Sequence, residues 1–362
     1  MSMRGDLLKV LRGEKTERIP WFADLSYYYF SQKQKGTLPK EFEGPEGEIA
    51  FYRHHRAGMC FYAPFTYKTE YVNGVSFEER TDETGIYSVY HTKYGDLTSV
   101  QKYLPSNFSW AYTKHFVEDE EDLKVMTHIF ASMRYTADYE PYRKMDALLG
   151  EDGFFVEMAP IPVSPVQKLL ARWAGVENTV GIYADEPELF EACIHAMEEA
   201  QMPVFDVLAD SGAEIIEFPE NLSSEVTGNF FDEYNLPYYK RINAVLHRAG
   251  KKTGIHIDGT LKPCLGKLSA AGFDFGEAVT PYPVGDVPLS ELRALAGDAL
   301  VIWGGLPGAM FTPVFTDRQF EEHIGKILEL NDGKMILGVA DQVPPDAVEH
   351  RIREVSRLIG RG

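Results

Sequence analysis

The sequence has few cysteines, no long apolar run and no cluster of basic residues. Only three cysteines occur in 362 residues, and they lack the CxxC spacing of a thiolate site, which favours a reduced, cytoplasmic protein. Apolar runs such as Ala299–Trp303 are far too short to span a bilayer, and the first residues lack the apolar core of a signal peptide. We therefore expect no membrane association.

Acidic residues exceed basic ones. Asp and Glu total 55 against 36 Lys and Arg, so the formal net charge is −19. Nucleic-acid phosphates attract basic stripes, and the absence of one excludes nucleic acid as the expected partner. The same balance disfavours a highly anionic substrate unless arginines converge locally.

Beyond residue 150, short apolar runs alternate with amphipathic stretches. This alternation indicates βαβ units and a parallel sheet. With about eight strands and no GxGxxG at a first strand–helix turn, we predict one (β/α)8 TIM barrel domain over residues 1–362. The expected strands are Ile19–Phe22, Phe154–Met158, Ile215–Phe218, Thr253–Ile257, Phe273–Ala278, Leu300–Gly304 and Met335–Val339, and the expected helices are Leu7–Arg12, Pro187–Leu208, 229–249, a segment ending near Ala271, and Ala347–Ile359.

Residues 68–115 follow a different pattern. They are rich in Tyr, Thr and Val with alternation of period two, and Asn73-Gly74 is a turn signal between β-formers. We predict an antiparallel hairpin or meander inserted in the barrel. The acidic run Glu118–Asp122 then predicts the start of a helix, because acids suit the first turn.

The carboxyl ends of the strands are where a barrel of this kind places its active site. His256 and Asp258 end one predicted strand, and alternation places them on the same side. An imidazole and a carboxylate so placed can share a metal or form an acid/base pair. In the alternative interpretation, Asp258 caps the next helix and His256 packs at the rim.

Other strand ends carry further polar residues. Glu217, Glu220 and Asn221 belong to the end of the strand that begins at Ile215, and they are candidates for oxygen ligands or substrate hydrogen bonds. Asp341 follows the last strand and is a candidate third ligand or general base. The alternatives are a helix entry or solvated loop for the first group and a turn-forming aspartate for Asp341.

Aromatic residues are dense near the N-terminus. Trp21, Tyr27, Tyr28 and Tyr29 are interpreted as the wall of an apolar substrate pocket that offers a few phenol hydroxyls. Ordinary core packing is the alternative for most of them.

Several segments together resemble the uroporphyrinogen decarboxylase superfamily over nearly the whole chain. These are the opening Leu7–Pro20 with its Arg-Ile-Pro entry into the first strand, Phe231–Lys240, His256–Gly259 and Trp303–Leu306, which match in order and spacing. The resemblance implies a (β/α)8 barrel. It also implies either decarboxylation of uroporphyrinogen or methyl transfer linked to corrinoid proteins.

The sequence departs from both chemistries at identifiable positions. The decarboxylases carry an arginine-rich first-strand segment, whereas Trp21–Tyr27 contains no arginine to hold carboxylates. The methyltransferases bind zinc through H-x-C and a late cysteine. Here His256 matches the histidine, Asp258 replaces the first cysteine, and Val339 or Ala340 stands in the region of the second.

The leading hypothesis is a methyltransferase that moves a methyl group from a small methoxylated or methylamine substrate to a corrinoid (cobalamin) protein. His256, Asp258 and Asp341 are the expected zinc ligands, with Asp258, Asp341 and Glu220 as catalytic groups. A decarboxylase of a small or porphyrinogen-like acid and an inactive binding module are the alternatives. The resemblance also implies a homodimer.

Overall fold

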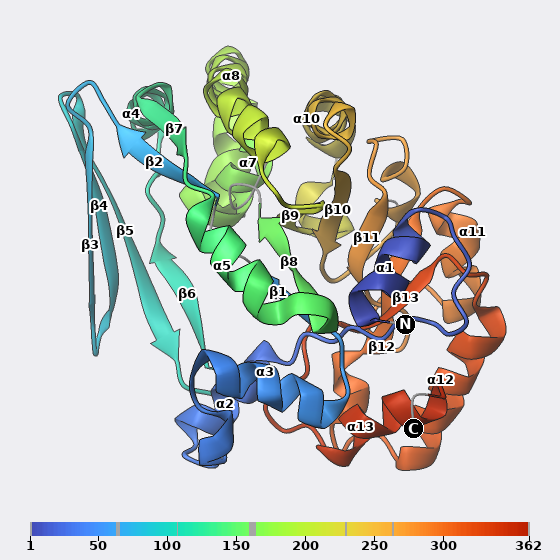
Figure 1. The fold of residues 1–362 in the computed structure, drawn as a ribbon. Coiled ribbons are helices and arrows are strands. Elements are labelled where there is room, and N and C mark those ends of the chain that lie inside the picture. The colour runs from blue at the N-terminus through green and yellow to red at the C-terminus, as the bar shows by residue number, and fades with distance from the viewer. Residues whose placement is uncertain are drawn as a thin grey trace.

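A parallel sheet of seven strands forms the centre of the molecule in a computed structural model (Figure 1). The structure describes residues 2–62, 66–106, 108–158, 164–228, 230–262 and 264–360. The strand order is β1-β8-β9-β10-β11-β12-β13, and every neighbouring pair is parallel. The strands are β1 Met59–Tyr62, β8 Gly153–Met158, β9 Ile215–Leu222, β10 Lys252–Ile257, β11 Phe275–Val279, β12 Val301–Pro307 and β13 Met335–Ala340.

A short segment near the N-terminus closes this sheet into a barrel. Trp21 forms a parallel bridge with Leu337 of β13, and Phe22 forms one with Gly58, next to β1. The Phe22 N–H donates to the Leu337 carbonyl at 2.9 Å, and the Gly58 N–H donates to the Trp21 carbonyl at 2.9 Å. Residues 21 and 22 are thus the eighth parallel segment, and the predicted barrel is confirmed.

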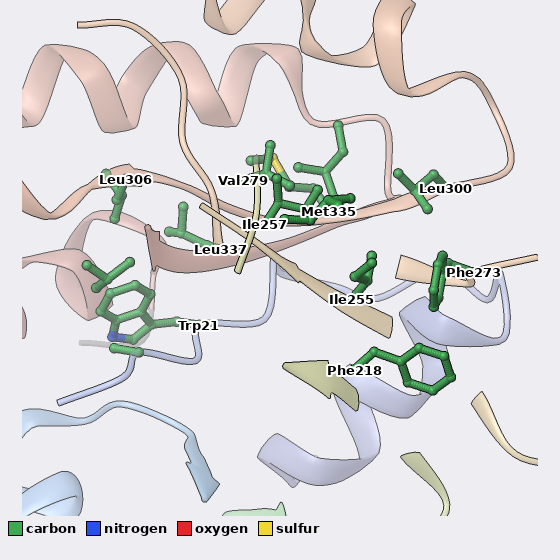
Figure 2. Packing of buried hydrophobic residues seen from close by; sticks show 14 of the residues in the cluster. Trp21, Phe218, Ile255, Ile257, Phe273, Val279, Leu300, Leu306, Met335 and Leu337 are labelled. Carbon is green, nitrogen blue, oxygen red and sulfur yellow. The ribbon is translucent and has the colours of Figure 1, made fainter. Parts of the chain in front are cut away.

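Alternation along the strands separates an inner from an outer apolar layer. The inner cluster holds Phe22, Phe275 and Trp303 together with residues of helix α1 (Met3–Leu11), so α1 closes the amino-terminal end of the barrel. The outer cluster holds alternate residues of the same strands and packs under the surrounding helices. Figure 2 shows part of this layer, with Trp21 beside Leu337.

Helices surround the barrel, and none of those described is long and apolar enough to cross a membrane. The helices are α1 Met3–Leu11, α2 Ser26–Gln34, α3 Gly44–His55, α4 Glu120–Ala131, α5 Glu140–Leu149, α6 Pro165–Lys168, α7 Gly175–Asp185, α8 Pro187–Asp210, α9 Ser224–Thr227, α10 Leu236–Arg248, α11 Leu292–Ala296, α12 Asp317–Leu330 and α13 His350–Leu358.

One predicted helix is wrong: the described residues between Asp258 and Ala271 contain only the 3₁₀ turn Leu265–Lys267. Two glycines and a proline over 259–266 explain this, since both residue types are poor helix formers.

The predicted antiparallel insertion is confirmed, and it forms one side of the molecule in Figure 1. Asn73 and Gly74 adopt the left-handed φ values, 58° and 76°, that an Asn-Gly turn requires. The two strands that this turn joins nevertheless belong to different sheets, because β2 pairs with β7 and β3 pairs with β4. The strands are β2 Tyr67–Tyr71, β3 Ser76–Asp82, β4 Gly85–Thr92, β5 Gly95–Leu104, β6 Ser109–Lys114 and β7 Met133–Ala137.

A buried carboxyl group on the outer face of β8 connects the barrel to this insertion. The Glu157 side chain is fully buried, and its Oε1 accepts a hydrogen bond from the Thr66 N–H at 2.9 Å, just before β2. Desolvation raises the pKa of Glu157 to about 8, although the hydrogen bond from Thr66 opposes the shift. The carboxyl group therefore carries a proton at neutral pH.

This raised pKa predicts a pH-dependent stability. In the unfolded chain, a glutamate has a pKa of about 4.3. Between that value and the native pKa the native state binds more protons, so the free energy of unfolding falls as pH rises through this window. Glu157→Gln stays neutral, so its stability relative to the parent protein should increase by about 4 kcal/mol from about pH 5 to about pH 9.

Urea unfolding at several pH values measures this difference, and Glu78→Gln on the exposed face of β3 is the matched control. If the free energy of unfolding depended on pH equally in Glu157→Gln and in the parent protein, the conclusion that Glu157 is protonated at neutral pH would be wrong.

Candidate active site

The register of the parallel strands brings a histidine and a glutamate together on the inner face of the barrel. His256 of β10 pairs with Glu277 of β11. On the other side of β10, Gly254 pairs with Glu217 of β9. Since side chains alternate along a strand, His256, Glu277 and Glu217 all point inward toward the carboxyl ends of the strands.

The imidazole of His256 has a carboxylate on each side. Its Nδ1 lies 2.5 Å from Glu277 Oε2, and its Nε2 lies 3.7 Å from Asp341 Oδ1. The His256 and Glu277 side chains are each 9% exposed, whereas that of Asp341 is 42% exposed. Asp341 is thus the member of this group that is open to solvent.

Burial and charge shift the proton affinities of these groups. Desolvation lowers the pKa of His256, but Glu277, Asp341 and Glu217 outweigh it and raise the pKa to about 10. Desolvation raises the pKa of Asp341 to about 7 against the opposing effect of His256. Desolvation, followed by the neighbouring Glu277, raises the pKa of Glu217 well above its usual value.

Glu217, His256 and Glu277 have the arrangement of a metal site. Each offers one ligand atom, and these atoms lie within 4.8 Å of one another. Glu217 is fully buried, and neither of its carboxyl oxygens has a hydrogen-bond partner among the described residues. One imidazole nitrogen with carboxylate oxygens is a donor set that zinc accepts in catalytic sites. These residues therefore fit a divalent cation.

A cavity of about 510 Å³, the first cavity, opens beside this cluster. His256 and Asp341 line it from the barrel, whereas Gln101 and Tyr112 line it from the inserted sheet. The insertion therefore covers part of the barrel mouth. The size falls within the usual range for small-molecule sites.

Glu220 and Asn221, two of the residues predicted at the end of β9, also line the first cavity. Glu220 is fully buried, and its Oε1 accepts hydrogen bonds from the Ser164 N–H at 2.7 Å and the Tyr239 hydroxyl at 2.9 Å. These contacts hold Ser164, the residue that caps α6, and Tyr239 of α10 against β9. They make Glu220 a positioning residue for the cavity wall.

Asp258 does not join the cluster as expected. Its side chain is exposed, and among the described residues no hydrogen bond or ion pair connects it to His256. The reason is that β10 ends at Ile257, so strand alternation no longer applies one residue later. Glu277 occupies the place beside His256 that was expected for Asp258.

The aromatic residues near the N-terminus also lie elsewhere than expected. Trp21 is fully buried in the outer layer, and Tyr28 and Tyr29 pack against Phe51 of α3. Neither these three residues nor Tyr27 is among the residues that line the first cavity. Because Phe22 faces the barrel interior, its neighbour Trp21 faces outward under the helices.

Glu277 was not recognised as a site residue from the sequence, and neither were Asp24 and Gln342, which are hydrogen-bonded to each other at the rim of the barrel. An acidic residue inside the apolar run Phe273–Val279 was the available signal for Glu277. Asp24 accepts hydrogen bonds from the Ser26 N–H at 2.8 Å and from Gln342 Nε2 at 2.9 Å. Asp24 thereby connects the barrel segment that contains Trp21 and Phe22 to the residues that follow β13. These residues are too far apart in the sequence for the contact to be predicted.

Comparison with known proteins assigns the family. The family model described as uroporphyrinogen decarboxylase (URO-D) matches residues 168–360, which is more than half of the chain. The chain belongs to the uroporphyrinogen decarboxylase family. No curated protein matches its sequence.

One solved structure extends the similarity of this URO-D family member to the whole fold. A methyltransferase from Methanosarcina mazei is 13% identical, with a TM-score of 0.64 over 100% of this chain and 99% of the other. A protein assigned as a vitamin-B12 independent methionine synthase from Listeria monocytogenes is 12% identical, with a TM-score of 0.45 over 95% of this chain and 96% of the other. At its low identity, the first of these shows the shared fold.

The barrel interior directly beneath the cluster is closed by an aromatic ring. Gly254 pairs with Phe275 across the sheet, and a Cβ at position 254 would collide with the Phe275 ring. The missing side chain thus provides the room in which Phe275 packs. The Phe275 ring therefore packs one layer below His256 and Glu277, on the amino-terminal side of the cluster.

The tight fit predicts opposite effects for two glycine substitutions. Gly254→Ala should lower the free energy of unfolding by about 1–3 kcal/mol through overpacking. Gly181→Ala, in α7 with nothing within 4 Å of the added Cβ, should raise it by roughly 0.5–1 kcal/mol, as expected inside a helix. Urea unfolding of both variants measures this, and a Gly254→Ala protein as stable as the parent would refute the packing account.

Proposed function

We propose that this URO-D family member is a methyltransferase that moves a methyl group from a small methoxylated or methylamine substrate to a corrinoid protein. The proposal depends mainly on one observation: His256 lies between Glu277 and Asp341 at the mouth of the barrel, with Glu217 beneath. Membership of an enzyme family and the shared fold with the Methanosarcina mazei methyltransferase agree with it.

Methyl transfer of this kind needs an acid at the leaving atom. The bond from the methyl carbon to oxygen or nitrogen breaks, and the leaving atom keeps the electron pair. The reduced corrinoid supplies the pair for the new bond to carbon, and the leaving atom takes up a proton. Asp341 suits this role because it faces the first cavity and its pKa of about 7 lets it hold a proton near neutral pH.

The carboxylate beside His256 also suits the charge that develops during transfer. The methyl group moves without its bonding electrons, so it carries partial positive charge as it leaves the substrate. Glu277 provides negative charge beside His256 at that end of the first cavity, whereas Asp341 serves as the acid. A methylammonium substrate would benefit from the same charge before reaction.

Zinc is the metal we propose for this site, with His256, Glu277 and Glu217 as ligands and Asp341 on the open side. The two unsatisfied carboxyl oxygens of Glu217 support a cation at this place. When bound, zinc would polarise the leaving atom as a Lewis acid. Asp258 is not included, because Glu277 takes its place beside the imidazole.

Among the described residues, too few cations line the first cavity for the carboxylates of uroporphyrinogen, which disfavours the decarboxylase alternative for that substrate. Uroporphyrinogen carries several such groups and needs several cations to bind them. Arg172 is the one arginine among the described residues that line the first cavity.

Reduced cobalamin provides the direct experiment. The full chain, incubated with reduced cobalamin and a panel of methoxylated aromatic compounds and methylamines, should form methylcobalamin from at least one donor, measured by absorbance. His256→Ala should lower the rate at least about 100-fold, as expected for loss of an acid/base or metal-binding group. Asp258→Asn, a matched change at the exposed neighbouring acid, should change it less than about threefold.

Two results would count against this proposal. The first is a failure to form methylcobalamin from any donor in the panel. The second is an Asp258→Asn protein that loses as much activity as His256→Ala, because the reacting centre would then lie at the exposed strand end.

A further inference from the structure

A second cavity lies under the inserted sheet and adjoins the first. Its volume is about 450 Å³, and three residues line both cavities: Gln101, Tyr112 and Arg172. The two are therefore neighbouring chambers that meet at these side chains. Together they have room for a ligand larger than the first cavity alone could hold.

The walls of the second cavity are largely aromatic. Tyr71 comes from β2, Tyr90 from β4, Tyr135 from β7, and Trp173 from the π-helical turn Leu169–Trp173. Tyr90 stacks on Trp173 with ring centroids 5.3 Å apart, and its hydroxyl lies 3.1 Å from that of Tyr71. Rings that converge from four elements around an open space provide flat faces and edges for another ring.

A guanidinium group lies where the two cavities meet. Arg172 contacts the Tyr112 hydroxyl, and among the described residues no carboxylate forms an ion pair with it. Lys168, which also lines the second cavity, differs because the Glu220 carboxylate lies near it. Arg172 is therefore an available cation in a chain whose net charge is −19.

An anion is the ligand that this position recognises. A guanidinium offers several N–H donors in a plane that matches the two oxygens of a carboxylate. Arg172 is the one arginine among the described residues that line either cavity, and it lines both. The anionic group is thus directed to the junction, on the side of the aromatic walls.

We propose that the second cavity binds the body of the substrate, and that this body is an aromatic ring with an anionic substituent such as a carboxylate. The ring packs among Tyr71, Tyr90, Tyr135 and Trp173, and the anion binds Arg172. That the ligand's methyl-bearing edge then faces His256 depends on the proposed methyl transfer. Binding of the ring and the anion does not depend on it.

Three related probes test this proposal by calorimetry with the full chain and no methyl acceptor. They are meta-methoxybenzoate, its neutral isostere meta-methoxybenzamide, and the saturated ring analogue of the benzoate. The benzoate should bind at least about tenfold more tightly than either of the others, since only it has both the charge and the flat ring. Equal binding of the amide would refute the anion site, and equal binding of the saturated acid would refute the aromatic site.

Two variants test where the benzoate binds. Arg172→Gln should reduce the affinity for the benzoate to that for the amide, and Tyr112→Phe should weaken it by a smaller factor because Arg172 loses its phenol contact. Arg318→Gln, on the exposed surface of α12, is the matched control and should bind as the parent does. Unchanged benzoate binding in a folded Arg172→Gln protein would overturn the proposal.

These outcomes separate the two proposals of function. Because the binding measurement contains no corrinoid, benzoate binding that requires Arg172 would stand even if no methylcobalamin formed. Methyl transfer from methylamines alone, without benzoate binding, would support the reaction and reject the aromatic site.

Discussion

The excess of carboxyl groups around one buried imidazole is the constraint on which the site depends. His256 balances a single negative charge, yet Glu277, Asp341 and Glu217 all lie close to it. An unpaired charge buried in a protein is costly, and the raised pKa values of Glu217 and Asp341 show one way to relieve that cost. A bound cation is the other way. Either solution makes this cluster chemically different from the rest of the barrel.

The fold produces this cluster and its surroundings by separate means. Parallel register places Glu277 beside His256, and closure of the barrel through Trp21 and Phe22 completes the ring of strands around them. The inserted sheet then supplies a wall that the barrel lacks, and the π-helical turn brings Arg172 to the same opening. The result is an opening with a histidine and carboxyl groups at its inner end and the Arg172 guanidinium near its aromatic side.

Sequence reasoning predicted those features that depend on local pattern. The run of short strands predicted the barrel, and the ends of those strands predicted that His256 and Asp341 lie close together, as their separation of 3.7 Å shows. Asn73 and Gly74 predicted a turn correctly, although the strands beside it pair with other partners. Asp258 was misplaced because the strand ends one residue too early for alternation to hold.

Features that depend on long-range contact could not be predicted in this way. Glu277 was visible as an acid in an apolar strand, but its partner is fixed only by the register of β10 and β11. The second cavity requires Tyr71 and Tyr135 of the insertion to meet Trp173, which follows much later in the chain. Which of Trp21 and Phe22 faces the barrel interior likewise depends on how this segment pairs when the barrel closes.

A crystal structure with anomalous diffraction recorded at the zinc edge tests the central claim most directly. The account predicts a single strong peak among His256 Nε2 or Nδ1, Glu277 and Glu217 in protein purified without chelator. No peak there would contradict the account. A peak only at the other group of possible ligands in the described chain, His54, His55 and Glu349, would contradict it equally.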